Sequence, residues 1–304
     1  QLEINPDCVV VGNVMSRGAA VVEAMLDRGI PYTSGPQWLA EHVLRERRVL
    51  AVAGTHGKTT TASMLAWILE DAGLKPGFLI GGIPANFGVS ARFGNSDFFV
   101  VEADEYDSAF FDKRAKVVHY RPETLSLNNL EYDHADIYED LDAIVWQFHQ
   151  LLRMVPGAGR ILRIGSDANL DALIALGCWT PVVTFGGDVC SVWDASLLNA
   201  DERRLRMKNP TGASAAARWG MSGTHNLENA LAAVAAAGSA GVDIERAVDA
   251  LSRFEGVKRR MERTATVANI AIYDDFAHHP TAIRRTINAV RKRYPGHRVV
   301  VAIE

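Results

Sequence analysis

Short apolar runs separated by longer helical patterns dominate the middle of this chain. Each run has four to six residues and is rich in Val, Ile, Leu and Ala, as in strands that are covered on both faces of a sheet. Such runs with helices between them predict a doubly wound, parallel α/β sheet. The five runs are Val49–Ala53, Phe98–Ala103, Thr124–Asn128, Arg160–Ile164 and Val182–Phe185.

The last part of this central region has a different pattern. Residues 188–221 are less regular and predict antiparallel hairpins at the edge of the sheet. The Ala-rich stretches 226–240 and 243–252 predict two packed helices.

Residues 1–48 predict half of a Rossmann-like unit. The pattern indicates a strand over Cys8–Val11, a helix over Arg17–Arg28 and a second helix over Pro36–Glu46. The first residue is Gln1, and we expect the sequence to be an internal part of a longer chain.

A new α/β pattern follows residue 264. It predicts a strand over Thr266–Tyr273, a helix over Thr281–Arg293 and a strand over Arg298–Ile303. These elements would start a Rossmann-like C-terminal domain, with Phe254–Val257 as the hinge. The expected domains are residues 1–48, 49–253 and 254–304.

The composition adds only broad limits. Of 304 residues, 48% are hydrophobic and 22% charged, as is usual for globular proteins. A net charge of −4 argues against nucleic acid or an anionic membrane as a partner. Three cysteines in so long a chain favour free thiols and a cytoplasmic location. No apolar run is long enough for a membrane-spanning helix.

A glycine-rich loop after the strand Val49–Ala53 predicts a nucleotide-binding site. Gly54 and Gly57 permit a tight turn with inward N–H groups, and the start of the next helix favours phosphate. Lys58 can reach the β- and γ-phosphates, and the Thr59 hydroxyl can bind Mg²⁺. The loop matches a shortened Walker pattern, G-T-x-G-K-T.

Acidic residues follow the predicted strand Phe98–Ala103. The carboxyl end of a parallel strand is where such sheets bind ligands. A carboxylate there, beside a phosphate loop, can hold Mg²⁺ directly or through water. Glu102 is the main candidate among the acidic residues 102–107. The alternative is a solvated acidic loop.

Two further polar patches contain candidate ligands. His134 could bind a metal or orient an acyl-phosphate, or it could be an ordinary loop residue. Asn226 and Asn229 lie one helical turn apart. They could bind the edge of a nucleotide base, or this segment could simply be a helix start capped by Gly223 or Thr224.

The last polar cluster lies beyond the predicted hinge. Arg260, delivered from a second domain, could stabilise charge on a transferring phosphoryl group. His278 and His279 suggest zinc, but adjacent histidines rarely converge on one metal. No H-x-x-x-H or C-x-x-C motif elsewhere supports zinc, so we expect none.

In this order and spacing, the blocks resemble the Mur ligase family, the ATP-dependent amide-forming ligases of bacterial peptidoglycan metabolism. The matching blocks are G-T-H-G-K-T-T-T (54–61), V-E-A-D-E (101–105), D-H (133–134), H-N-x-x-N (225–229), R-R-M-E (259–262) and D-D-F-A-H-H-P (274–280). Three further segments are similar to the branch that recycles a murein tripeptide: Ser34–Trp38, Glu105–Arg114 and Val118–Tyr120. The resemblance also implies that residues 1–48 are part of a UDP-sugar-binding domain and that residues 254–304 begin an amine- or peptide-binding domain.

The resemblance implies an enzyme that joins L-alanyl-γ-D-glutamyl-meso-diaminopimelate to UDP-N-acetylmuramate through an acyl-phosphate, with ATP and Mg²⁺. ATP would contact Gly54, Thr55, His56, Gly57, Lys58, Thr59, Thr60, Asn226, Asn229, Arg260 and Asp275. Mg²⁺ would be held by Thr59, Glu102 and His134, and catalysis would depend on Lys58, His134 and Arg260.

Two related activities stay open at this point: a UDP-N-acetylmuramate–L-alanine ligase and a folylpolyglutamate synthase-like ligase. Many relatives carry a carbamylated lysine after the D-H block. This chain has no lysine between Lys116 and Lys208, which resembles the branch that uses UDP-N-acetylmuramate. A nucleotide-binding module without catalysis is the alternative from another functional class.

Overall fold

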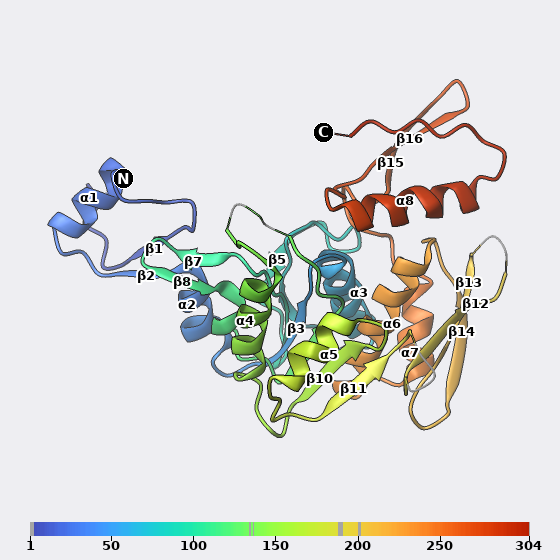
Figure 1. Ribbon diagram of the computed structural model, residues 1–304, viewed down its shortest axis with the longest axis horizontal. Coiled ribbons are helices and arrows are strands. Elements are labelled where there is room, and N and C mark those ends of the chain that lie inside the picture. The colour runs from blue at the N-terminus through green and yellow to red at the C-terminus, as the bar shows by residue number, and fades with distance from the viewer. Residues whose placement is uncertain (1–2, 134, 136, 188–190, 200–201, 304) are drawn as a thin grey trace.

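The computed structural model describes residues 3–133, 135, 137–187, 191–199 and 202–303 (Figure 1). A seven-stranded sheet forms its centre, in the order β11-β10-β9-β3-β6-β4-β5. All neighbouring strands are parallel except β4 and β5. The strands are β3 (Arg48–Ala53), β4 (Gly77–Leu79), β5 (Ala91–Arg92), β6 (Phe98–Glu102), β9 (Thr124–Leu127), β10 (Arg160–Ile164) and β11 (Val182–Phe185). The five predicted core strands and the parallel α/β class are therefore confirmed.

Helices cover both faces of this sheet. One face is covered by α3 (Lys58–Asp71) and α6 (Thr224–Ser239), and α7 (Ile244–Leu251) packs on both of these helices. The opposite face carries α4 (Leu141–Leu152) and α5 (Ala168–Ala175) (Figure 1). Right-handed crossovers place helices on opposite faces when strands are added in opposite directions from the first strand.

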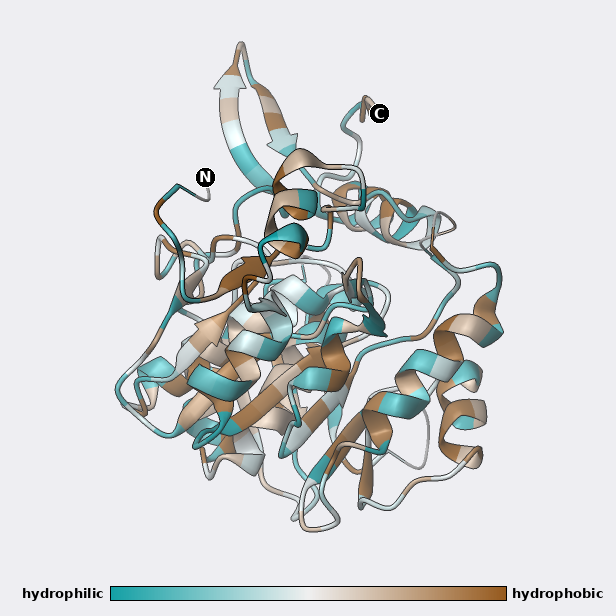
Figure 2. Ribbon diagram, turned by 90° about the vertical axis from the view of Figure 1, so that its left-hand side faces the viewer, coloured by the Kyte–Doolittle hydropathy of each residue, from teal (hydrophilic) through white to brown (hydrophobic). Residues whose placement is uncertain are grey.

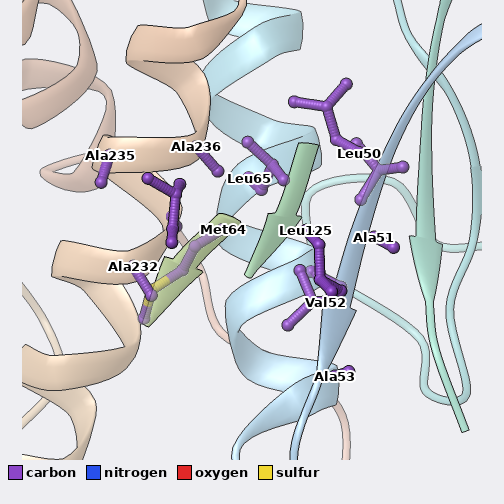
Figure 3. Packing of buried hydrophobic residues seen from close by; sticks show 14 of the residues in the cluster. Leu50, Ala51, Val52, Ala53, Met64, Leu65, Leu125, Ala232, Ala235 and Ala236 are labelled. Carbon is purple, nitrogen blue, oxygen red and sulfur yellow. The ribbon is translucent and has the colours of Figure 1, made fainter. Parts of the chain in front are cut away.

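Small side chains let the core close tightly around the strand that leads to the phosphate loop. The buried α6 residues Ala232 and Ala236 lie on the side of the helix that faces α3, whereas Ala235 lies on the opposite side, as Figure 3 shows. Met64 of α3 is fully buried. Figure 2 shows that hydrophobic residues concentrate on the inner strands. The residue at the end of β3, Ala53, is also fully buried, so the loop that follows starts from a rigid base.

The N-terminal segment forms a small βαβ unit, in which the first strand and the helix were predicted and the second strand was not. Strands β1 (Val9–Val11) and β2 (Tyr32–Ser34) pair in parallel and are joined by α1 (Ala20–Asp27). The predicted second helix begins as α2 (Gly35–Leu39) and continues as π-helical turns over Ala40–Leu44.

A hairpin that the sequence did not predict contacts this unit. Strands β7 (Asp107–Ala109) and β8 (Asp112–Ala115) are antiparallel, and a 3₁₀ helix over Lys116–His119 follows them. The Phe111 ring at the turn lies 4.9 Å from the ring of Tyr32, between centroids. The missed strands have only three and four residues and a largely polar sequence.

The hairpins predicted in 188–221 form a separate three-stranded antiparallel sheet. Its strands are β12 (Asp194–Leu197), β13 (Arg204–Lys208) and β14 (Ser214–Arg218). A single parallel bridge between Phe185 and Trp193 places this sheet beside β11. The edge position is therefore confirmed.

Two predictions for the C-terminal segment are wrong. The predicted strand 266–273 is a hairpin of β15 (Glu262–Val267) and β16 (Ile270–Asp274), which turns at Ala268 and Asn269. Residues 298–303 form no strand, because no neighbouring strand among the described residues pairs with them. The predicted helix is present as α8 (Pro280–Arg293).

The predicted hinge is tied to a loop of the central sheet. The Ala85 N–H donates to the Gly256 carbonyl at 2.9 Å, and the Lys258 N–H donates to the Ile83 carbonyl at 3.0 Å. These bonds fix the path of the chain from α7 into the C-terminal segment. Within the described residues, no helix is both long and apolar enough to cross a membrane.

Candidate active site between the central and C-terminal segments

The phosphate loop needs glycine for both conformation and space. Gly54 has φ +135° and Gly57 has φ +82°, values that other residues rarely adopt. A Cβ on Gly57 would lie 2.4 Å from Oδ1 of Asn229. Gly57 therefore lets the α6 asparagine approach the start of α3. The block at residues 54–61 and the block at residues 225–229 are therefore in contact.

Lys58 is held by a buried carboxylate at the mouth of this loop. Its Nζ lies 2.8 Å from Glu105 Oε2 and 3.3 Å from the Thr55 carbonyl. The side chains of Lys58 and Glu105 are only 12% and 3% exposed. The alternative of a solvated acidic loop is therefore wrong for Glu105. A nucleotide phosphate would offer Lys58 a second anion in place of this carboxylate.

Thr59 and Glu102 form the predicted oxygen-donor pair. The Thr59 hydroxyl donates to Glu102 Oε1 at 2.8 Å, and the Gly81 N–H donates to Glu102 Oε2 at 2.6 Å. The other acidic side chains of the cluster form ion pairs with lysines: Asp104 with Lys116 and Asp107 with Lys113.

Arg260 reaches this pair from the C-terminal segment. Its Nη2 donates to Thr59 Oγ1 at 3.1 Å. Burial lowers the pKa of Arg260, while the Glu102 and Asp275 carboxylates act in the opposite direction. The hydrogen bond to Thr59 places the Arg260 guanidinium beside the Thr59–Glu102 pair. Hydroxyl and carboxylate oxygens are ligands that Mg²⁺ prefers, so the residues present fit this ion.

The Asp275 side chain shapes the loop that presents Arg260. Its Oδ2 accepts from the Met261 N–H at 2.8 Å, and its Oδ1 accepts from the Ala277 N–H at 2.9 Å. The carboxylate thus joins the two polar stretches of the C-terminal segment.

A cavity of about 80 Å³ lies between the central region and the C-terminal segment. Asn226 and Asn229 line it and are buried. Gly223 stands at the N-cap position of α6 without a side-chain cap, and Asn226 Nδ2 donates to the Ser222 carbonyl at 2.8 Å. Of the two cap positions considered from the sequence, Gly223 is therefore the one that caps α6. The other cavity-lining residues are His56, Gly57, Thr60, Asn128, Asn129, Phe185, Met221, His225, Glu228, Arg260, Met261, Asp275, Ala277, Ala282, Arg285 and Thr286.

The imidazole of His225 lines this cavity and is uncharged at neutral pH. Burial lowers its pKa to about 4, and the positive charge of Arg285 acts in the same direction. Arg285 is itself paired with Glu228 at 2.8 Å across the two segments.

The remaining histidine candidates differ in placement. His134 lies outside the residues that the structure describes. His278 is exposed, and its Nδ1 lies 3.0 Å from the carbonyl oxygen of Phe276. His279 instead approaches His56 and Glu131, and one potential ligand atom from each of these three lies within 4.8 Å of the others.

Sequence reasoning missed four polar participants of the site: Glu105, Gly81, Glu131 and Thr281. Glu105 stands inside the V-E-A-D-E block and Glu131 lies two residues before the D-H block, so their positions were signals that could have been used. Thr281 binds Glu131 from 150 residues further along the chain, and nothing local in the sequence indicates this contact.

Comparison with known proteins agrees with this geometry. Residues 52–237 match the Mur ligase middle domain, and residues 259–303 match the Mur ligase, glutamate ligase domain. The chain therefore belongs to the Mur ligase family.

Three relatives within the family are similar to this chain in sequence or structure. The UDP-N-acetylmuramate–L-alanyl-γ-D-glutamyl-meso-2,6-diaminoheptandioate ligase of Escherichia coli K12 is 52% identical over all of this chain and 66% of its own length. The structure of the UDP-N-acetylmuramate:L-alanyl-γ-D-glutamyl-meso-diaminopimelate ligase from Neisseria meningitides is 55% identical, with a TM-score of 0.80 over 84% of this chain and 81% of that one. A UDP-N-acetylmuramate–L-alanine ligase of Desulfitobacterium hafniense is 34% identical over 96% of this chain and 63% of its own. The chain thus spans about two thirds of the length of these curated relatives.

Proposed function

We propose that the protein to which this chain belongs joins a murein tripeptide, L-alanyl-γ-D-glutamyl-meso-diaminopimelate, to UDP-N-acetylmuramate with hydrolysis of ATP to ADP and phosphate. The observation that carries the proposal is the contact of Arg260 with Thr59. It brings a cation from the C-terminal segment to the phosphate loop, so ATP would be held from both sides. The higher identity to the tripeptide ligases than to the L-alanine ligase supports the choice of amine.

The first step transfers the γ-phosphoryl group of ATP to the muramate carboxylate. A carboxylate oxygen forms the new bond to phosphorus as the bond to the leaving ADP oxygen breaks. Lys58 and Arg260 would stabilise the charge that builds up on the phosphoryl oxygens. Thr59 and Glu102 are the side chains that would hold Mg²⁺, which supplies further charge neutralisation when bound. His134 is proposed as a ligand beside the acyl-phosphate.

The second step forms the amide. The neutral amino group of the incoming peptide attacks the acyl carbon, phosphate leaves, and the nitrogen loses a proton. Side chains that hold both substrates in place would supply much of the rate enhancement. Asn226 and Asn229 are proposed to contact the adenine side of ATP, with Asp275 meeting the nucleotide from across the hinge and Gly54–Thr60 around its phosphates.

Phosphate release by the full-length protein tests this proposal. The enzyme receives ATP, Mg²⁺ and UDP-N-acetylmuramate with either the tripeptide or L-alanine. We expect much faster release with the tripeptide, because its additional carboxylates provide charged contacts that alanine lacks. Equal or faster release with L-alanine would assign the chain to the L-alanine-adding branch. ATP binding without amine-dependent release would indicate a binding module.

A further inference from the structure

Glu131 lies between the phosphate loop and the C-terminal segment and contacts both. Its Oε1 lies 3.0 Å from Nε2 of His56, in the phosphate loop. Its Oε2 accepts a hydrogen bond from the Thr281 hydroxyl at 2.7 Å, in the first turn of α8. The carboxylate is 33% exposed and the imidazole of His56 is 13% exposed, so the bridge is partly shielded from water.

The backbone of Glu131 is fixed to the same loop. Its N–H donates to Thr55 Oγ1 at 2.8 Å, and the Thr55 hydroxyl donates back to the Glu131 carbonyl at 3.0 Å. The backbone of Glu131 is therefore tied to the residue that precedes His56. The second carboxylate oxygen is the part of Glu131 that faces the C-terminal segment.

His56, Glu131 and His279 also have the composition of a zinc site, but the hydrogen bonds argue against one. Asn129 Oδ1 accepts a hydrogen bond from the backbone N–H of His56 at 2.9 Å, which fixes the orientation of the Asn129 amide. Its Nδ2 therefore donates to His56 Nδ1 at 3.1 Å. A neutral His56 must then carry its proton on Nε2 and donate it to Glu131.

The second histidine leads to the same conclusion. The Thr281 N–H donates to His279 Nδ1 at 3.3 Å, so this nitrogen already accepts a hydrogen bond. The other nitrogen, Nε2, lies 3.3 Å from the carbonyl oxygen of Tyr132 and can donate to it. Zinc needs an unprotonated nitrogen with an available lone pair, and both nitrogens that face Glu131 are already used.

The charge of Glu131 fits its place as an acceptor. Burial alone raises the pKa of this carboxyl, but hydrogen bonds from Thr281 and His56 together hold it below its usual value. Burial lowers the pKa of His56, so the imidazole is neutral at pH 7. The ionised Glu131 carboxylate therefore accepts two charge-assisted hydrogen bonds, one from the neutral imidazole of His56 and one from the hydroxyl of Thr281.

We propose that Glu131 is a positioning residue that couples the phosphate loop to the C-terminal segment through Thr281. Nucleotide in the loop orders His56 and Glu131, and these then hold the first turn of α8. In the reverse direction, docking of α8 fixes the loop for the nucleotide, because coupling between two sites is reciprocal. The bridge adds to the Arg260–Thr59 contact and is formed by different residues.

Hydrogen exchange of the α8 amides in the full-length protein tests the proposal, with ADP affinity measured in parallel. Thr281→Val removes the hydroxyl and keeps the shape. Loss of a hydrogen bond to a charged group shifts an equilibrium roughly tenfold or more. We expect exchange in the first turn of α8 to rise by about that factor, and the protection that ADP gives to α8 to disappear. Thr281→Ser should restore both.

Two further variants keep the test decisive. Glu131→Gln removes the charge from the other side of the bridge and should uncouple α8 in the same way, even if Thr281→Val fails to fold. Thr264→Val is the matched control, because the Thr264 hydroxyl bonds within its own hairpin, to the Ile272 carbonyl. It should leave α8 exchange and ADP affinity at wild-type values.

Several results would overturn the coupling role. Wild-type exchange and ADP affinity in Glu131→Gln would do so, as would a Thr281→Ser variant that behaves like Thr281→Val. Exchange in α8 that rises when a chelator is added would favour a metal site instead. The inference rests on the proposed function only in taking ATP as the ligand. A wild-type protein that binds no ADP would therefore contradict the proposed function, while exchange without nucleotide still tests the bridge.

Discussion

Replacing Glu105 with glutamine should destabilise the nucleotide-free protein, because it leaves the charge of Lys58 without its buried partner. The two side chains are 3% and 12% exposed, and their charged atoms lie 2.8 Å apart. Removing one member of a buried ion pair costs roughly 3–5 kcal/mol. Lys58 keeps the Thr55 carbonyl as an acceptor at 3.3 Å, and a glutamine oxygen can also accept. We therefore expect a value near the lower limit, about 3 kcal/mol.

Thermal unfolding with and without a non-hydrolysable ATP analogue measures this effect. For a domain of about 200 residues, a loss of 3 kcal/mol lowers Tm by roughly 6–12 °C. Saturating analogue should recover part of the difference, since its phosphates supply the negative charge that the Glu105→Gln variant lacks. The analogue should therefore raise the Tm of this variant by more than it raises that of the wild type.

Two controls decide whether charge is the cause. Glu139→Gln changes an exposed carboxylate and should shift stability by less than about 0.5 kcal/mol. Lys58→Met together with Glu105→Gln removes both charges and should cost less than the sum of the single changes. An unchanged Tm for Glu105→Gln, additive single costs, or equal stabilisation of variant and wild type by the analogue would each refute this reasoning.

The remaining predictions concern turnover, pH and packing. In the full-length enzyme, Lys58→Ala and Glu102→Gln should each lower turnover at least about 100-fold; near-normal phosphate release in either variant would exclude the assigned role. Because burial lowers the pKa of His225 from 6.5 to about 4, the unfolded protein gains a proton before the folded one does. The corresponding stability is therefore present above pH 6.5 and lost as pH falls to about 4, by roughly 3 kcal/mol. Urea unfolding against pH would show this loss in the wild type, and a His225→Gln variant with the same pH profile would contradict the assignment. A Cβ on Gly82 would lie 2.7 Å from Cγ2 of Thr59. Gly82→Ala should thus weaken ATP binding and destabilise the fold by about 1–3 kcal/mol, and wild-type values in a binding titration and a melt would argue against the close packing.

The sequence alone was sufficient wherever a local pattern carries the information. Val49–Ala53 is apolar throughout because both faces of its strand are covered, so its place in the sheet was predictable. The glycines and Lys58 of the phosphate loop are adjacent in sequence and act within one turn. The hairpin turn at Ala268 and Asn269 was missed because these residues adopt φ values of +48° and +65° without the glycine that usually indicates such a turn.

Tertiary structure decided which distant polar groups meet. Glu105 joins Lys58 across 47 residues, and Thr281 reaches Glu131 across 150. Hydrophobic periodicity predicts which face of an element is buried, but it does not specify the order of strands or the side on which a later segment docks. Those two features place the carboxylates beside the phosphate loop. The sequence therefore determined the elements and the chemistry available, while the partners of each charged side chain follow from packing, because they depend on contacts between elements that are remote along the chain.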